Sequence, residues 1–237
     1  QNRQRSDLRL FEFGKSYSMR DGKYHEINGV GVLLNGLRHP GTWDHKKEPF
    51  SFYYLKSTVQ NILSASGFVV PMGAWQYQGD HPQLEDCVAC MHKEEVVGVY
   101  GRVRKKLLKE FGLQGPAFYA YLNLDLLERK FSAPRLKALE PPRFPEVHRD
   151  LSMILDRGIR YADLEKLAFN TDKGLLREVG LFDVYEDAKL GENKKSYALS
   201  FVLRDDEKTL TDKEIDKSMQ RIMDAFEREM GAVIRKG

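Results

Sequence analysis

The sequence predicts an α+β protein in two parts, a module built mainly on antiparallel strands followed by a domain in the order βαββαβ. Two observations predict this organisation. Four prolines fall between residues 133 and 145, in a stretch without helical or strand periodicity that is typical of an extended linker. On both sides of that stretch, apolar residues change repeatedly between the period of a strand and the period of a helix.

The first part opens with a long antiparallel pair, because apolar and polar residues alternate over residues 7–37 around a turn at Asp21 and Gly22. Residues 51–67 change to helical spacing, and Gly67 ends that run. A helix is therefore expected to pack on the sheet. The remaining elements expected here are three short strands, a basic amphipathic helix and an aromatic-rich strand, at residues 73–78, 85–92, 95–101, 102–110 and 118–127.

The second part alternates strands and helices in a clear order. Strands are expected at residues 149–156, 176–186, 195–204 and 232–235, and helices at residues 161–170 and 212–230. Thr211 and Glu214 form a capping box at the start of the last helix, and Gly231 is placed to end it. This order predicts a ferredoxin-like fold, in which two helices cover one face of a four-stranded sheet.

A ferredoxin-like sheet leaves its second face open to a partner. Alternation along residues 195–204 turns Ser200 and Arg204 outward, and Ser152 and Tyr185 follow by the same test. A base of single-stranded RNA can stack on Tyr185 while hydroxyl and guanidinium groups contact base edges or phosphates. The predicted RNA-binding residues are Ser152, Tyr185, Ser200 and Arg204 on the open face, and Lys194 and Lys195 at a hairpin tip. Asp183 and Arg235 are also expected on the open face, without a predicted RNA contact.

Each of these side chains also has a structural explanation. An outward strand residue is often merely solvated, and paired lysines at a hairpin tip keep a strand entrance soluble. The whole chain has a net charge of only +3. Residues 141–237 hold about 18 lysines and arginines against about 20 aspartates and glutamates. Any RNA site must therefore be a local patch.

No catalytic or metal-ligating residue is predicted. Cys87 and Cys90 form a single C-x-x-C motif in a strand-like run, and the nearby His81 and His92 do not have the spacing of a zinc site, which favours reduced structural thiols. The glycine-containing segment 191–196 lacks the spacing of a phosphate-binding loop. The remaining sequence offers no nucleophile–base pair and no paired-carboxylate pocket.

Composition and patterning predict a soluble, cytoplasmic protein without membrane contact. No apolar run approaches the roughly 18 residues of a membrane helix, and the first residues lack the layout of a signal peptide. The chain begins at Gln1, in a segment that soon becomes a strand. We therefore expect it to be a portion of a longer chain.

Four segments of the second part form a recognisable series. They are Phe-Pro-Glu-Val-His-Arg-Asp-Leu-Ser-Met from Phe144, Leu-Phe-Asp-Val-Tyr from Leu181, Gly-Glu-Asn-Lys-Lys-Ser from Gly191 and Thr-Leu-Thr-Asp-Lys-Glu-Ile from Thr209. In order and spacing they resemble the ferredoxin-fold anticodon-binding domain of phenylalanyl-tRNA synthetase β subunits. Four matches in order make this resemblance far more specific than one short motif.

Segments of the first part point to the same family. Leu-Phe-Glu-Phe-Gly-Lys-Ser-Tyr from Leu10, Phe-Tyr-Tyr-Leu-Lys from Phe52 and the pair His81-Pro82 are similar to the end of that subunit's class II synthetase-like module. Family members commonly carry Gly-Arg after this His-Pro, where the chain has Gln83-Leu84. A class II active site needs one arginine for the α-phosphate and another in a glycine-rich strand and helix, and neither set is found.

The resemblance implies a degenerate class II synthetase-like module over residues 1–135, a Pro-rich linker over 136–143 and a ferredoxin-fold anticodon-binding domain over 144–237. It implies a non-catalytic, tRNA-binding portion of phenylalanine-tRNA ligase, supporting the charging of tRNA(Phe) in the α subunit of an α2β2 heterotetramer. ATP and Mg2+ would serve the intact enzyme, with no cofactor in this portion. The alternative is a scaffold that contacts only protein subunits and does not bind RNA independently.

Overall fold

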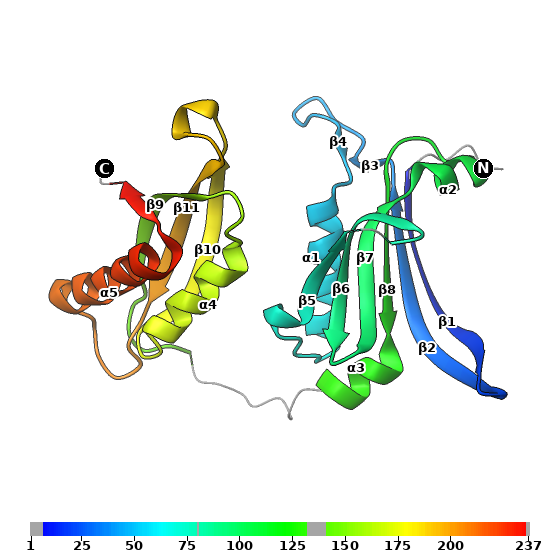
Figure 1. Cartoon of the computed structure of the whole chain (residues 1–237), viewed down its shortest axis with the longest axis horizontal. Helices are drawn as coiled ribbons and strands as arrows, with labels where there is room; N and C mark the ends of the chain where they lie inside the picture. Colours follow the sequence, from blue (N-terminus) through cyan, green and yellow to red (C-terminus); the bar gives the residue numbers. More distant parts are fainter. Residues whose placement is uncertain (1–6, 80, 132–140, 236–237) are drawn as a thin grey trace. The chain divides into compact units, whose positions relative to one another are not determined.

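The computed structural model describes residues 7–79, 81–131 and 141–235 (Figure 1). The chain divides into two compact units, Gln1–Lys137 and Ala138–Gly237, called unit 1 and unit 2 below. Each unit combines helices with an antiparallel sheet, which confirms the predicted α+β class. Residues 136–140 of the predicted linker lie outside the described residues, so the predicted domain limits stay predictions.

Unit 1 is built on a six-stranded antiparallel sheet in the order β1-β2-β8-β7-β6-β5. The long pair β1 and β2 turns at Asp21 and Gly22, where the alternation of the sequence predicted it. A separate short pair, β3 and β4, lies between this hairpin and the first helix. The strands span Leu8–Arg20 (β1), Lys23–Asn35 (β2), Leu37–His39 (β3), Glu48–Pro49 (β4), Trp75–Gly79 (β5), Leu84–His92 (β6), Glu95–Val103 (β7) and Ala117–Asn123 (β8).

Helix α1 (Phe52–Ala65) covers one face of this sheet. The Ser51 hydroxyl accepts a hydrogen bond from a backbone N–H of the first turn at 3.2 Å, which starts the helix at the predicted place. Leu55, Val59 and Leu63 form its buried stripe and pack with inward-facing residues of β2, β7 and β8. A short 3-10 turn, η1 (Met72–Ala74), precedes β5.

The expected strand over residues 118–127 is wrong beyond Asn123, because helix α3 (Leu124–Phe131) begins there. The Asn123 side chain accepts a hydrogen bond from the N–H three residues on, at 3.0 Å, which is the geometry of a helix N-cap. Asp125 in the first turn accepts hydrogen bonds from the backbone and side-chain amides of Asn28, at 2.8 and 2.9 Å. These contacts tie α3 to β2.

The basic helix expected over residues 102–110 is shorter than predicted. Helix α2 spans Lys105–Glu110, because Arg102 and Val103 still pair with β6 as the end of β7. Leu108 is its buried residue, while the lysines of this helix are exposed. The charged face of α2 is thus a solvated face, as its amphipathic pattern indicated.

Unit 2 has the element order βαββαβ and the sheet order β10-β11-β9-β12, with antiparallel neighbours throughout. This confirms the predicted ferredoxin-like fold. The elements are Val147–Asp156 (β9), Tyr161–Thr171 (α4), Leu176–Tyr185 (β10), the 3-10 turn Ala188–Leu190 (η2), Lys194–Leu203 (β11), Asp212–Met230 (α5) and Val233–Arg235 (β12).

Helices α4 and α5 lie together against one face of the unit 2 sheet (Figure 1). The predicted capping box is present, since the Thr211 N–H donates to the Glu214 carboxylate at 2.9 Å, and Gly231 ends α5 at a φ of 61°. None of the helices in the described part of the chain has the length and apolar character that a bilayer crossing requires.

A buried carboxylate locks this helix layer. Asp172, 3% exposed and directly after α4, accepts hydrogen bonds from the N–H groups of Gly174 and Leu175 at 3.1 and 2.9 Å. It also accepts from the Ser218 hydroxyl at 2.5 Å and the Arg221 guanidinium at 2.7 Å, both on α5. Burial by itself raises the pKa of Asp172, but the hydrogen bonds outweigh burial and leave the pKa below its ordinary value.

Candidate nucleic-acid interface

The candidate interface is the face of the unit 2 sheet turned away from α4 and α5, called the open face below. Residues directly opposite each other on neighbouring strands share a face, so the register of β10, β11, β9 and β12 defines it. Three successive rows across it hold Tyr185, Ser196, Ile154 and Val233; then Asp183, Ala198, Ser152 and Arg235; then Gly180, Ser200 and Asp150. The structure thus brings the predicted Ser152, Tyr185 and Ser200 onto one face.

Small side chains form the middle of the open face. Ser196, Ala198 and Ser200 follow one another on the central strand β11, with Ser152 beside them on β9. A Cβ atom on Gly180 would lie 2.6 Å from the Ser200 hydroxyl oxygen, so glycine leaves that hydroxyl its space. Flat ligands can approach such a strip closely, and its hydroxyls can donate or accept hydrogen bonds.

Tyr185 stands at one end of this strip and is held in place. The residue is 47% exposed, and its hydroxyl donates a hydrogen bond to Asp187 at 3.0 Å. The other oxygen of Asp187 accepts from the backbone N–H of Lys189 at 2.8 Å. The bond to Asp187 raises the pKa of the Tyr185 phenol. A phenol ring tied in this way is an exposed aromatic surface with little freedom to rotate.

The two lysines of the predicted site face opposite sides of the sheet. Lys194 lies on the open face and forms an ion pair of 2.6 Å with Asp156 across the strands. Lys195 is only 6% exposed, and its ammonium donates to the carbonyl of Ile159 at 2.5 Å and to the hydroxyl of Tyr197 at 2.7 Å. The structure therefore corrects the expectation for Lys195, because strand alternation turns its side chain toward the helices. There the aliphatic part of the side chain packs, and the ammonium group is satisfied by hydrogen bonds within unit 2.

Arg204 lies beyond the end of β11 that is far from Tyr185. It follows the last residue of β11, about eight residues from the Tyr185 row, which is roughly 26 Å along a strand. Its guanidinium forms ion pairs with Glu146 at 2.7 Å and Asp206 at 3.0 Å. Hydrogen bonding to Asp206, and to Glu146, raises the pKa of Arg204. Arg204 thus fastens the ends of unit 2 and cannot share one bound base with Tyr185.

Carboxylates outnumber cations on the open face. Its exposed acidic residues are Glu178, Asp183, Asp150 and Asp156, against Arg235 and the ion-paired Lys194. A phosphate over the middle of this face would meet like charge, whereas the amino groups of unpaired bases would meet hydrogen-bond acceptors. The arrangement suits base edges in the centre and phosphates near the margin where Arg235 lies.

Two side chains beside the site were not in the predicted set. Asp187 was missed, although the order Tyr-Glu-Asp before a turn is a signal that an aspartate can hold its own backbone and a nearby hydroxyl. Phe182, 60% exposed, lies at a shift of strand register between Leu181 and Asp183. Simple alternation assumes an unbroken register, so it gives no sign of such a bulge.

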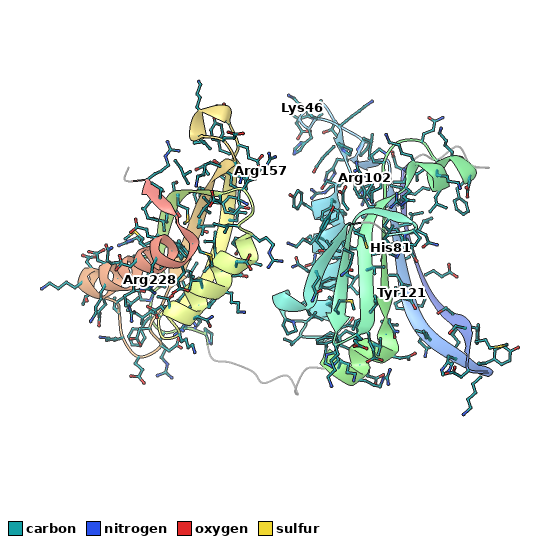
Figure 2. The ribbon with its side chains drawn as sticks, in the orientation of Figure 1. Lys46, His81, Arg102, Tyr121, Arg157 and Arg228 are labelled. Atoms are coloured by element: carbon teal, nitrogen blue, oxygen red, sulfur yellow. The ribbon has the colours of Figure 1, made fainter. Side chains whose placement is uncertain are left out.

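Unit 1 has a corresponding sheet face away from α1. Two tyrosine rings cover part of it, and a cavity of about 1360 Å³, lined by Gly31, Leu33, Tyr119 and Leu108 among others, lies on the same face. A Cβ atom on Gly29 would lie 2.4 Å from the ring of Tyr121, which Figure 2 labels on β8, and one on Gly31 would lie 3.1 Å from the Tyr119 hydroxyl. This strand has no room to cradle a phosphate. Among the described residues no three His, Cys, Asp or Glu side chains gather as a metal site requires. The described residues therefore offer no cluster of side chains of the kind that holds Mg2+.

Cys87 and Cys90 are buried and free. Burial raises the pKa of the Cys87 thiol, and it raises that of Cys90 to about 11. A thiol with a raised pKa stays protonated near neutral pH and reacts slowly, so both cysteines act as small apolar side chains of the sheet.

Two family models match the chain. Residues 1–124 match the phenylalanyl tRNA synthetase beta chain CLM domain, and residues 142–235 match the ferredoxin-fold anticodon binding domain. The chain belongs to the phenylalanyl-tRNA synthetase β-chain family. The match over residues 142–235 includes every strand and helix of unit 2, so the open face is part of the anticodon-binding-type domain of this β-chain family.

Relatives in the β-chain family match over almost the full chain. It is 37% identical over 244 residues to the phenylalanine–tRNA ligase beta subunit of Porphyromonas gingivalis, covering 98% of this chain and 30% of that protein. It is 35% identical over 243 residues to the Bacteroides fragilis subunit, covering 99% and 30%, and 33% identical over 229 residues to the Thermotoga maritima subunit, covering 97% and 29%. The chain thus spans less than a third of the length of these relatives.

One solved structure with partial likeness is a pyrrolysyl tRNA synthetase from Desulfitobacterium hafniense. The two overlap with a TM-score of 0.38 and 13% sequence identity, over 56% of this chain and 44% of that one. A likeness of this size is too weak to bear on function, and the assignment to the β-chain family stands on the sequence matches.

Proposed function

We propose that this chain is a non-catalytic, tRNA-binding portion of a phenylalanine-tRNA ligase β subunit, and that it binds tRNA through the open face of unit 2. The observation that carries the proposal is the held phenol of Tyr185. A half-exposed aromatic ring, fixed by Asp187 beside a strip of small residues, is a ready stacking surface for an unpaired base. Such a ring has little role in the core of its own unit.

In the proposed complex, one unpaired base stacks on Tyr185. The hydroxyls of Ser152 and Ser200 and the Asp183 carboxylate contact base edges. Arg235 at the margin, and Lys194 once it is released from Asp156, contact phosphates. Lys195 and Arg204 hold unit 2 together and are left out of the RNA surface.

By this proposal, the charging of tRNA(Phe) takes place in the α subunit, which would supply the ATP and Mg2+ chemistry. The intact enzyme would be a cytoplasmic α2β2 heterotetramer. Support comes from the names of the relatives, which are phenylalanine–tRNA ligase beta subunits, and from the match to an anticodon binding domain.

The test is a binding titration of the chain with a tRNA(Phe) transcript and an unrelated tRNA over a salt series. Tyr185→Ala should lose about 1–3 kcal/mol of binding free energy, roughly a 5- to 150-fold loss in affinity, because one base loses its stacking partner. Tyr24→Ala is the matched control, since Tyr24 is exposed on unit 1. Equal affinity of the parent and Tyr185→Ala at every salt concentration would contradict the open-face site.

A second function, docking of another protein subunit, is favoured by the long hairpin of unit 1. Strand β1 lies at the edge of its sheet and exposes Phe11, Phe13, Tyr17 and Met19 at 61% or more. A long edge strand with exposed apolar side chains tends to associate with another chain. The two functions are compatible, because they use different units.

Docking is tested by capture of the α subunit on the immobilised chain. Phe11→Glu and Phe13→Glu together should abolish capture, because charged side chains cannot be buried at such a contact without a partner. Lys15→Glu on the same strand is the control for the effect of charge at the exposed edge. Capture that survives the double substitution would exclude β1 as the docking edge.

A further inference from the structure

Trp43 is the most exposed of the large hydrophobic side chains described, with 98% of its surface open to solvent. It belongs to the loop between β3 and β4, which projects past the start of α1 (Figure 1). Tryptophan offers a wide aromatic face and is concentrated at binding surfaces, where that face becomes buried. Because this side chain adds nothing to the core of unit 1, folding alone does not explain it.

The loop around Trp43 is built as a tight turn. The backbone N–H of Thr42 donates to the carbonyl of His45 at 2.9 Å, and the Thr42 hydroxyl donates to the Asp44 carboxylate. Gly41 has a φ of 86°, and a Cβ atom there would lie 2.9 Å from the side chain of Lys47, so the loop closes on itself where only glycine fits. Trp43 is therefore presented on an ordered tip.

The base of the loop is fastened as well. Arg38 on β3 forms an ion pair of 3.0 Å with Glu48 on β4. The same guanidinium lies 4.8 Å above the ring of Tyr54 on α1. A tip held at both ends loses little conformational entropy when it binds.

The charges of the tip are arranged so that two cations remain available. Hydrogen bonds from Thr42, and then from His45, lower the pKa of Asp44, whose carboxylate is thus satisfied inside the turn. The Glu48 carboxylate forms its ion pair with Arg38. Lys46 and Lys47 are exposed, and neither forms an ion pair with any residue that the structure describes. Figure 2 shows Lys46 on the outer part of this loop.

We propose that this tip, Trp43 with Lys46 and Lys47, is a second RNA contact, in which Trp43 stacks on an unpaired base and the lysines meet the neighbouring phosphates. An exposed aromatic face beside free ammonium groups is the combination that binds unpaired nucleotides. A protein pocket would bury the tryptophan too, but it would have to supply acidic partners for two adjacent lysines. The proposal rests on the proposed RNA binding of the chain and adds a contact on unit 1.

Fluorescence can report this contact directly. The chain has two tryptophans, and Trp75 packs 5.2 Å from the ring of Tyr100. In the full chain carrying Trp75→Phe, Trp43 is the single tryptophan, and excitation at a wavelength that tyrosine does not absorb reports it alone. Addition of a tRNA(Phe) transcript at low salt should quench its emission, with the same midpoint as binding measured by electrophoretic mobility, and added salt should reverse the quenching.

Two substitutions test affinity. Trp43→Ala should weaken binding about 5-fold or more, as the loss of one stacked base requires. Lys46→Glu with Lys47→Glu should weaken it further and lower the slope of log affinity against log salt by about 2. Lys105→Glu with Lys106→Glu on α2 is the matched control, because it changes the net charge of the chain equally at another exposed site. Equal effects of the two double substitutions would overturn the proposal.

The outcomes separate this proposal from the open-face site. Unchanged Trp43 emission during tRNA binding that remains sensitive to Tyr185→Ala overturns the tip contact and leaves the open face in place. Quenching that persists in a Tyr185→Ala chain of unchanged affinity supports the tip and removes the open face. If Trp43→Ala leaves tRNA affinity unchanged and instead lowers capture of the α subunit, the tip is a protein anchor and the RNA contact is excluded.

Discussion

Each unit packs helices against one side of an antiparallel sheet, and the two units differ in what lies on the other side, which in unit 1 includes the short helix α2. In unit 1, Tyr119 and Tyr121 extend over Gly31 and Gly29 and occupy the face with side chains of the sheet itself. In unit 2, the central strand carries small residues there, and the aromatic ring of Tyr185 stands at the end of the strip. Rings of its own sheet cover part of the unit 1 face, with a cavity of about 1360 Å³ on the same face, whereas small side chains line the unit 2 face.

The difference means that a shared architecture does not decide which side chains a sheet face presents. Large side chains lying flat over glycines give a sheet its own cover, since close packing leaves no room for a second molecule. Serines and alanine on a central strand give no such cover. The proposed binding on unit 2 therefore depends on a few residues of its open face.

The largest expected effect tests whether the open face needs the helix layer behind it. Asp172→Ala removes the acceptor of four hydrogen bonds. It also leaves the fully buried hydroxyl of Ser218 without its hydrogen-bond acceptor. The free energy of unfolding of unit 2, measured in urea, should fall by about 2–4 kcal/mol. tRNA binding should be lost near the lowered urea midpoint. Asp163→Ala, which removes an exposed ion pair with Arg160, should change stability by less than about 1 kcal/mol.

The same carboxylate gives a pH dependence of known sign. The folded-state pKa of Asp172 is lowered, so its contribution is fully present above the unfolded value of about 3.9 and is lost as pH falls through the folded pKa. The stability difference between the parent and Asp172→Ala should therefore shrink below about pH 4. A difference that stayed constant down to pH 2 would show that the group does not titrate with folding.

The position of the Tyr121 ring over Gly29 in unit 1 is tested by giving Gly29 a side chain. Gly29→Ala should cost about 1–3 kcal/mol of stability, because the new Cβ atom meets the Tyr121 ring at 2.4 Å and the ring must move. In a Tyr121→Ala background the same change should cost far less, and a double-mutant cycle measures the coupling. Costs that simply add would mean that the ring does not cover Gly29.

The sequence could predict those features of the fold and of the candidate site that depend on patterns between residues close in the chain. The order of unit 2, the capping box at Thr211 and the outward set around Ser152 and Ser200 all follow from strand and helix periods, which unit 2 obeys. Lys195 was placed by its neighbourhood at a hairpin tip, although alternation with Tyr197 already turned it inward. Helix α3 was missed because Leu122, Leu124 and Leu126 alternate with Asn123 and Asp125, which continues the period of the preceding strand.

Contacts between residues far apart in the sequence could not be predicted from such local patterns. The partners of Arg204, Glu146 and Asp206, become neighbours only when the strand ends meet, and the four hydrogen bonds to Asp172 need both helices in place. The tyrosine rings over Gly29 and Gly31 depend on the pairing of β2 with β8. No pattern within a single segment contains this information.

A smaller effect tests whether a larger side chain on the open face blocks tRNA binding. Gly180→Val should lower tRNA affinity about 10-fold, because a branched side chain beside Ser200 fills the strip where a base would lie. Its stability should stay within about 1 kcal/mol of the parent, since the Ser200 hydroxyl can rotate and valine favours strands. Gly14→Val on β1 is the control, because a Cβ atom there would lie no closer than 4.0 Å to its nearest neighbour, the Glu12 carboxylate. Unchanged tRNA affinity in Gly180→Val would mean that no base lies there.

The smallest effect concerns how firmly the ring of Tyr185 is held. Asp187→Asn removes the charge that accepts the phenol hydrogen, so the raised pKa of Tyr185 should move down toward the ordinary value of about 10. Ultraviolet titration of phenolate absorbance, with Tyr185→Phe to identify the signal, measures this shift in the free protein. tRNA affinity should fall only about 2- to 3-fold, because the ring keeps its area and loses part of its orientation. If the titration moves while affinity does not, Tyr185 stacks without help, and the open face owes its binding to the ring and the small residues alone.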